Sequence, residues 1–312
     1  MKKVFYLFAL IATLAFSSCE HKELYYGSTR TANVKVIFDW KKAPGAAPKT
    51  MSLYLFPGDG GPVQRYEFTD RTGGIVKIPV GNYNVLCLNS DSELIQLRGI
   101  SRWETFEAYT GEERMLGSLG IRSGSVPRAD GTGTEKISLA PDMLWSDRAK
   151  NIEITLLPAE QAITLYPGES VCSYTVEIRN ASNLKYVSDL GGTLSGMAGG
   201  LLPGPDELTT ERVTVPFKTV SDGISTITGS FLTFGSSPTI GNTNRLVIYA
   251  ILADGSKWYY TYDVTGQVRS APDKRHVRIV LDGLPLPKPI ANGGGFQPSV
   301  DDWKNVNVDI PM

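Results

Sequence analysis

The segment Cys172–Arg179, with the sequence CSYTVEIR, decides the fold class of this 312-residue chain. Its apolar residues are Cys172, Tyr174, Val176 and Ile178, and each is followed by a polar residue. Successive side chains of an extended chain point to opposite faces. This alternation therefore predicts a β-strand that buries one face and exposes the other.

Similar apolar segments recur on both sides of this strand. We expect further strands at residues 33–40, 51–56, 63–68, 75–80, 83–89, 151–157, 213–218, 226–234, 245–252, 258–264 and 276–281. Turn residues separate them, and the chain has 32 glycines and 19 prolines to supply such turns. Segments 51–56 and 63–68 predict one hairpin, and segments 75–80 and 83–89 predict a second, with 83–89 as a strand covered on both faces.

Only two short segments show a helical period. Trp103, Phe106 and Tyr109 lie three residues apart, which predicts a short helix within residues 101–110. Leu184, Val187 and Leu190 allow one helical turn within residues 183–190. Closely spaced strands with so little helix favour an all-β chain of antiparallel β-sandwiches over a βαβ fold.

The chain divides into two strand-rich halves of similar length. Leu157-Pro158-Ala159-Glu160 lies between them and is the predicted domain boundary. We expect an N-terminal β-sandwich over residues 32–157 and a C-terminal β-sandwich over residues 158–285. Residues 286–312 form a linker and a terminal strand.

The amino terminus carries a predicted secretion signal over residues 1–18. Lys2 and Lys3 precede the uncharged run Val4–Phe16, which is shorter than the roughly 20 residues of a membrane span. Ser17-Ser18-Cys19 closes this run and resembles the lipobox of bacterial lipoproteins. The resemblance implies acylation of Cys19, a lipidated tether over residues 19–31 and a location at the outer membrane. The alternative is an ordinary cleaved signal with a cysteine after the cleavage site.

Composition argues against most catalytic centres. With two histidines and three cysteines, the chain is poorly equipped for a histidine-rich metal centre or an iron–sulfur cluster. His276 shares the polar face of a predicted strand with Arg278, which favours a solvated histidine over a catalytic base. We predict no catalytic residue, metal or cofactor. The 31 basic and 32 acidic residues leave no basic excess for binding nucleic acid.

The two cysteines that remain besides Cys19 lie in apolar strands of different halves. Cys87 and Cys172 are therefore interpreted as buried thiols. An exported protein can also oxidise such a pair to a disulfide, and this alternative stays open.

Surface loops and aromatic residues are the candidate contact elements. Residues 111–136 and 195–207 are rich in turn residues and are expected to be loops. Trp103, Tyr109, Trp145 and Trp258 are candidates for stacking on a sugar. They would serve an alternative function, that of a glycan-binding surface lipoprotein in a nutrient-uptake system. Packing in the core is the competing interpretation for each ring.

The carboxyl terminus ends in a predicted separate strand. Three prolines and a glycine run precede Val306, Val308 and Ile310, which alternate with polar residues. Such a strand can pair with an open sheet edge of a neighbouring subunit. It can equally cap an edge of its own sandwich.

Several stretches carry a family resemblance. They are Cys19 with its signal, Val36–Trp40, Met51–Pro57, Pro79–Tyr83, Leu86–Asp91, Leu194–Gly200, Gly294–Phe296 and Asp301–Trp303. With these the chain resembles the fimbrillin-like outer-membrane lipoproteins of Bacteroides-type bacteria.

The resemblance implies tandem transthyretin-like or immunoglobulin-like β-sandwiches and a role in adhesion or fimbrial assembly without catalysis. Implied partners are membrane lipid, other fimbrial subunits and host or glycan ligands. Related subunits lose an amino-terminal strand after an arginine, and Arg30 lies at that place. If residues 34–40 stay in the first sandwich, an anchor, a tip or a stand-alone subunit is favoured over a stalk.

Overall fold

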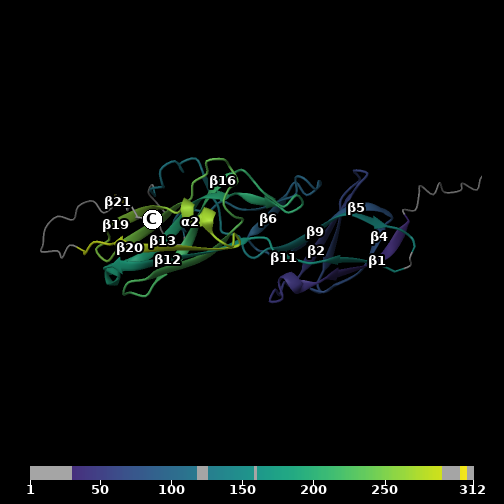
Figure 1. Cartoon of the computed structure of the whole chain (residues 1–312), viewed down its shortest axis with the longest axis horizontal. Coiled ribbons are helices and arrows are strands. Elements are labelled where there is room, and N and C mark those ends of the chain that lie inside the picture. The colour runs from purple at the N-terminus through teal and green to yellow at the C-terminus, as the bar shows by residue number, and fades with distance from the viewer. Residues whose placement is uncertain (1–29, 118–125, 158–159, 290–302, 308–312) are drawn as a thin grey trace, which may run out of the picture.

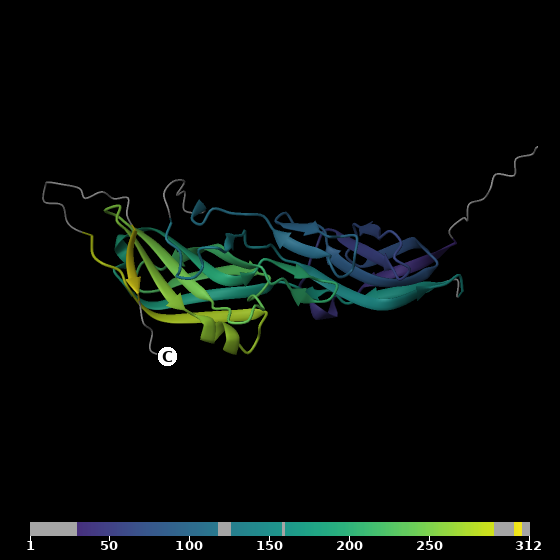
Figure 2. The ribbon, with the colours of Figure 1, turned by 90° about the horizontal axis from the view of Figure 1, so that it is seen from above.

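The computed structural model describes residues 30–117, 126–157, 160–289 and 303–307. Within these ranges nearly all regular structure is β-strand. Two β-sandwiches lie end to end along the long axis, with a small sheet between them (Figures 1 and 2). The all-β prediction is confirmed.

The first sandwich contains a three-stranded and a five-stranded sheet. The smaller sheet has the order β10 (Gln161–Leu165), β1 (Thr31–Phe38), β4 (Gly73–Pro79). The larger sheet has the order β11 (Gly168–Glu169), β9 (Trp145–Ile154), β5 (Gly81–Asn89), β2 (Met51–Pro57), β3 (Gln64–Phe68). A 3-10 helix, η1 (Trp40–Lys42), follows β1 and buries Trp40.

Strand β5 lies in the middle of the larger sheet and is covered on both faces, as its apolar sequence predicts. Val85 and Cys87 belong to the core between the two sheets of this sandwich. Leu86 and Leu88 point the other way, into a separate core described below.

The predicted hairpin between residues 75–80 and 83–89 is wrong. β4 and β5 belong to different sheets, and the chain crosses between the layers at Val80. The Val80 N–H donates to the carbonyl of Arg30 at 2.8 Å, whereas Gly81 pairs with Ile154 of β9. Both strands bury apolar residues in one core from opposite sides, so they cannot be neighbours in one sheet.

The first sandwich continues beyond the expected boundary at Leu157. β10 pairs in parallel with β1, from Val34 opposite Gln161 to Phe38 opposite Leu165. Ile163 and Leu165 are buried in the first core. Burial of these side chains holds residues 161–169 in the first sandwich.

The second sandwich is one nine-stranded sheet that curls so that its halves enclose a core. Its order is β20 (His276–Pro285), β12 (Cys172–Ser182), β17 (Ile227–Thr233), β16 (Arg212–Ser221), β13 (Val187–Ala198), β18 (Arg245–Leu252), β19 (Lys257–Asp263), β21 (Trp303–Asn307), with β8 (Lys136–Ile137) beside β16. The first part of β16 pairs with β13 and its last three residues pair with β17.

The predicted amphipathic strand is β12, and its apolar face is buried in the second core as expected. The described helical elements of this half are η3 (Leu184–Tyr186), inside the predicted 183–190 segment, and α2 (Thr265–Ser270). Most neighbouring strands are antiparallel, but β12 pairs with β20 in parallel.

A small sheet joins the two sandwiches. It has the order β15 (Glu207–Leu208), β14 (Gly200–Leu202), β7 (Glu107–Thr110), β6 (Ile95–Arg98) and so combines segments from both halves of the chain. Phe106 packs edge-on against Tyr54 with ring centroids 4.8 Å apart, and Trp103 packs against Phe56 at 5.6 Å. Phe234 of the second half is buried in the same cluster, which we call the junction core.

The predicted helix over residues 101–110 is wrong. One helical hydrogen bond forms, from the Phe106 N–H to the Arg102 carbonyl at 3.0 Å, and β7 then begins at Glu107. Trp103 and Phe106 are both buried in the junction core, although the segment between them is not a helix.

We expect Phe106→Ala to lower the free energy of unfolding by about 3 to 5 kcal/mol, because it leaves a cavity in the junction core. Denaturant unfolding followed by far-UV circular dichroism measures this loss. Ile100→Ala is the matched control, since Ile100 is nearby in sequence and 44% exposed. A loss below about 1 kcal/mol for Phe106→Ala would contradict the importance of this core.

Candidate functional site

The terminal strand β21 covers an edge of the second sandwich. It runs parallel to β19, with Lys257 opposite Trp303 and Tyr260 opposite Val306. Without β21, β19 would present a row of unpaired backbone groups, which favours pairing with another chain. In this structure the strand caps its own sandwich.

Side chains on both faces of β21 hold it to the sandwich. Val306 packs against the second core. On the outer face, the Trp303 ring lies edge-on to Tyr249, with centroids 5.3 Å apart. The Lys304 ammonium lies 5.0 Å from the centroid of the Trp258 ring, a cation–π contact. The other two predicted residues of this strand, Val308 and Ile310, lie outside the described residues.

The chain enters the first sandwich at the opposite end of the molecule from β21. β1 begins at Thr31, and Figures 1 and 2 show the amino-terminal end of the sandwich far from β19 and β21. Cys19 lies outside the described residues. Within the described ranges, no helix has the length and apolar character needed to cross a bilayer.

The four candidate sugar-binding aromatics have separate partners. Trp103 is buried in the junction core, and Trp145 lies edge-on to Trp40 with centroids 6.3 Å apart. The Arg98 guanidinium covers the ring of Tyr109 at 4.5 Å, and Lys304 covers that of Trp258. The structure does not bring these rings together as a stacking surface.

The two segments expected to be surface loops, residues 111–136 and 195–207, both contain buried apolar residues. Residues 118–125 lie outside the described residues, but Met115 and Ala129 on either side are buried against Tyr249. The Tyr249 hydroxyl also donates to the Pro127 carbonyl at 2.7 Å. Residues 195–202 form the end of β13 and strand β14 instead of a loop, because their apolar residues fill the junction core and the second core. Residues 203–206 form the turn that leads to β15.

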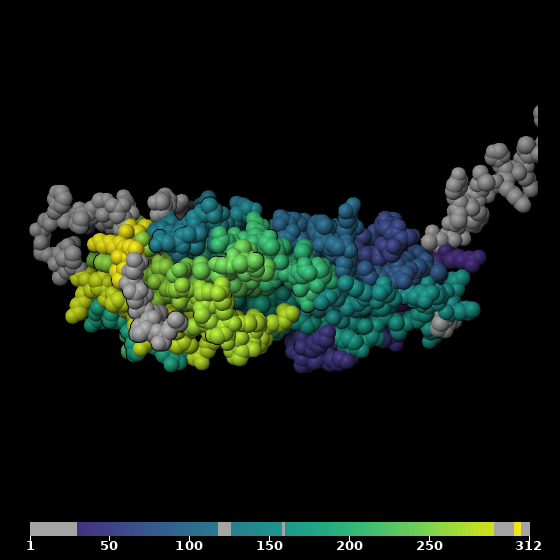
Figure 3. All heavy atoms as spheres, turned by 45° about the horizontal axis from the view of Figure 1, so that its top comes forward, coloured from purple at the N-terminus to yellow at the C-terminus, as the bar shows by residue number. Residues whose placement is uncertain are grey.

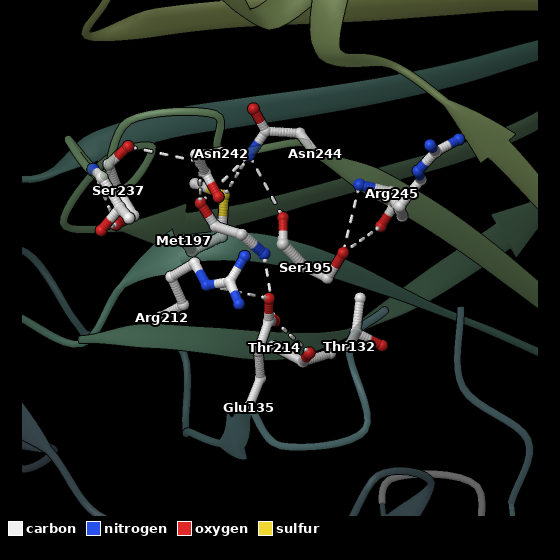
Figure 4. Close-up of polar contacts among 12 residues, drawn as sticks. Thr132, Glu135, Ser195, Met197, Arg212, Thr214, Ser237, Asn242, Asn244 and Arg245 are labelled. Carbon is white, nitrogen blue, oxygen red and sulfur yellow. Dashed lines mark hydrogen bonds and ion pairs between the residues drawn. The ribbon is translucent and has the colours of Figure 1, made fainter. Parts of the chain in front are cut away.

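A buried carboxylate fixes a bulge in β13 (Figure 4). Glu135 has a side chain 2% exposed and accepts hydrogen bonds from the Gly196 N–H at 3.1 Å and from the Thr214 hydroxyl at 2.9 Å. Arg212 lies 3.9 Å from its other oxygen. Gly196 has a φ of +72°, and an added Cβ would lie 2.2 Å from the Thr243 carbonyl oxygen, so glycine is required there.

Two buried asparagines complete this polar network. The Asn242 side-chain amide donates to the Gly196 carbonyl at 2.8 Å, and that of Asn244 donates to the Ser195 carbonyl at 3.2 Å. The Ser195 hydroxyl accepts from the Arg245 N–H at 3.1 Å. These contacts use the polar groups to hold backbone in place, which is a structural role.

His276 lies exposed at the start of β20. Its Nδ1 is 2.8 Å from a carboxylate oxygen of Asp273, and its Nε2 is 3.2 Å from one of Glu169. These carboxylates, Asp273 above all, raise the pKa of His276 above its ordinary value of 6.5. Across the described residues, no group of three or more His, Cys, Asp or Glu side chains is arranged to hold a metal ion.

Cys87 and Cys172 are free thiols in the structure, each buried in a different sandwich. Burial raises the pKa of both thiols, which keeps them protonated and poorly reactive.

Sequence reasoning missed Glu135 and the junction core. Glu135 follows a run of small polar residues that is typical of a solvated loop, and no local signal marks it as buried. The rings of Tyr54 and Phe106 converge only through tertiary pairing of strands far apart in the chain. The alternation of apolar and polar residues predicts which side chains are buried. It does not predict which side chains of distant strands they contact.

Comparison with known proteins gives a family and similar folds. Residues 18–218 match the model of a family described as a domain of unknown function, DUF5119. A protein of Bacteroides ovatus named "Putative fimbrium anchoring subunit Fim4B" is 26% identical over 351 aligned positions, covering 98% of each chain.

Two crystal structures share the fold. One, described as "a putative adhesin" from Bacteroides ovatus, has a TM-score of 0.63 at 20% identity and covers 91% of this chain and 94% of its own. The other, described as "putative polysaccharide binding proteins (DUF1812)" from Bacteroides thetaiotaomicron, has a TM-score of 0.52 at 13% identity, covering 81% and 90%.

We expect Glu135→Ala to lower the free energy of unfolding by about 2 to 4 kcal/mol, because it leaves the buried Gly196 N–H without an acceptor. Chemical denaturation measures the change. Glu112→Ala, at an exposed position in the same region, is the control and should stay within about 0.5 kcal/mol of the parent. Equal effects of the two substitutions would contradict a role for the buried carboxylate.

The ion pair of His276 predicts a pH dependence. A folded-state pKa above 6.5 means that the pair stabilises the fold fully below pH 6.5, and that this contribution is lost as the pH rises through the folded pKa. NMR titration of the His276 ring should give the raised pKa, and Asp273→Asn should lower it. A titration unchanged by Asp273→Asn would contradict the assignment.

Proposed function

This chain belongs to the DUF5119 family, and we propose that it acts at the cell surface as a non-catalytic fimbrial subunit that anchors a fimbrium. Similarity over nearly its whole length to a protein named as a fimbrium anchoring subunit supports this role. The fold shared with a protein described as an adhesin agrees with it.

The observation that carries the proposal is the placement of the two termini. The chain enters at the far end of the first sandwich, and its terminal strand β21 lies on the second sandwich (Figures 1 and 2). A subunit held by lipid at one end and joined to a neighbour at the other can link a membrane to a filament.

Acylation of Cys19 is part of this proposal. A signal that ends at a cysteine agrees with a lipid tether. Retention of β1 agrees with an anchor as well. β1 lies between β4 and β10, and Val34 and Val36 are buried, so the first sandwich is complete from its own chain.

The β19 edge is the proposed joining site. Within the described residues, β21 spans Trp303–Asn307 and pairs with β19 over five positions. Its departure would free five backbone positions of β19 for a strand of another subunit, and would free β21 to pair elsewhere. Either exchange requires β21 to leave β19.

Glycan binding has less support. The four candidate rings are buried or covered by separate partners, so they offer no stacking platform within the described part of the chain.

A disulfide that locks β21 to β19 tests the joining site. Tyr259 and Asn305 lie opposite each other in the register. We expect Tyr259→Cys with Asn305→Cys to lower the amount of fimbrial material that purifies with the chain from cells by about tenfold, because the strand can no longer leave. Reduction before assembly should restore it.

A second disulfide supplies the control. Ile251→Cys with Lys257→Cys links β18 to β19 and leaves β21 unlinked. This variant should assemble like the parent. Normal assembly of the locked chain, with the bridge verified by mass spectrometry, would contradict the proposal.

A further inference from the structure

Three aliphatic side chains are exposed together at the amino-terminal end of the first sandwich. Val80 is 40% exposed, Leu156 is 45% exposed and Leu157 is 80% exposed. Exposed aliphatic residues that cluster on a surface commonly mark a contact site. We call Val80, Leu156 and Leu157 the end patch.

Strand pairing places the end patch where the chain enters the fold. Val80 donates its N–H to the Arg30 carbonyl, directly before β1. Ile154, two residues before Leu156, pairs with Gly81, directly after Val80. The end of β9 and the start of β1 therefore lie side by side, as Figure 2 shows and the space-filling view of Figure 3 agrees.

The short tether between Cys19 and the first sandwich would keep this end of the molecule close to the membrane. Ten residues, 20–29, separate Cys19 from Arg30. Even fully extended, the chain from Cys19 to Arg30 spans no more than about 40 Å, and any shorter path brings the sandwich closer to the bilayer. Arg30 is the first described residue after the tether and accepts a hydrogen bond from Val80, so the end patch lies beside the point where the tether joins the fold.

The charges around the patch do not favour an electrostatic partner. Arg30 and Lys77 lie at this end, and so do Asp59 and Glu153 on either side of Asn82. These side chains give no positive excess, so they provide no net attraction to anionic headgroups. Apolar contact is then the driving force, which favours the boundary between headgroups and acyl chains.

We infer that the end patch inserts into the outer leaflet of the membrane that holds the acyl anchor, and that it orients the long axis of the molecule away from the bilayer. This inference rests on the proposed lipid attachment at Cys19. The tether alone would let the molecule lie in any direction, and three aliphatic contacts at its base would select an upright one.

A reporter at the patch tests the insertion. Leu157→Cys in the full chain provides an accessible thiol for an environment-sensitive fluorophore, since Cys87 and Cys172 are buried. Ile224→Cys is the matched control. Ile224 is 79% exposed on the β16–β17 hairpin, whose strands place it at the far end of the second sandwich.

The acylated chains are reconstituted in phosphatidylethanolamine vesicles that contain doxyl-labelled lipid. We expect quenching at position 157 to exceed that at position 224 by about threefold or more, with a blue shift on insertion. The difference should persist at high salt, because the contact is apolar. Equal quenching at the two positions would overturn the inference. So would a label at 157 that is shielded before vesicles are added, because the chain itself would then cover the patch.

A second preparation separates this inference from the proposed acylation. A hexahistidine tag replaces residues 1–19, and a nickel-chelating lipid supplies the tether. Failure of the native chain to float with vesicles would contradict acylation of Cys19. Quenching of the tagged chain at 157 then still decides whether the end patch enters the bilayer.

Discussion

The junction core is the contact on which the arrangement of the whole chain depends. Tyr54 and Phe56 lie on the outer face of the larger sheet of the first sandwich, and Phe106 and Phe234 reach them from the small sheet and the second half. Burial of large aromatic rings in one cluster removes much apolar surface from water. Two sandwiches with separate cores are thereby joined into one elongated body with its chain entry and its terminal strand far apart (Figure 1).

The polar network around Glu135 serves the same arrangement from the second half. Its carboxylate and the amides of Asn242 and Asn244 hold the bulge at Gly196, where β13 ends before β14 enters the small sheet. Buried polar groups are costly unless each finds a partner. The hydrogen bonds that the Glu135 carboxylate and the two amide nitrogens make to backbone groups therefore fix the course of the backbone at the place where the second sandwich meets the junction.

Much of this fold could be predicted from the sequence, and the exceptions share a cause. The alternation in Cys172–Arg179 identified β12 and its buried face, and the apolar run in residues 83–89 identified a strand covered on both sides. The pairing of β4 with β5 and the helix over residues 101–110 were wrong. The spacing of apolar residues predicts which side chains are buried. The sheet that a strand joins depends on pairing with strands distant in sequence, as Gly81 of β5 pairs with Ile154 of β9. The candidate site follows the same rule: a terminal strand with Val306, Val308 and Ile310 was predicted, and the described strand β21 contains Val306 but begins earlier, at Trp303. Its pairing with β19 was not predicted.

The position of β1 determines how the molecule bears load. A pull on a tether enters the fold at Arg30 and runs along the axis of β1, which has β4 on one side and β10 on the other. The hydrogen bonds on both sides lie across the direction of the pull, so they share the strain and must rupture together instead of opening one by one. Resistance to forced unfolding depends on the rate of that rupture. The first sandwich therefore resists a pull on the tether through strands that are loaded in shear. Such resistance suits a protein on a cell that is exposed to fluid flow.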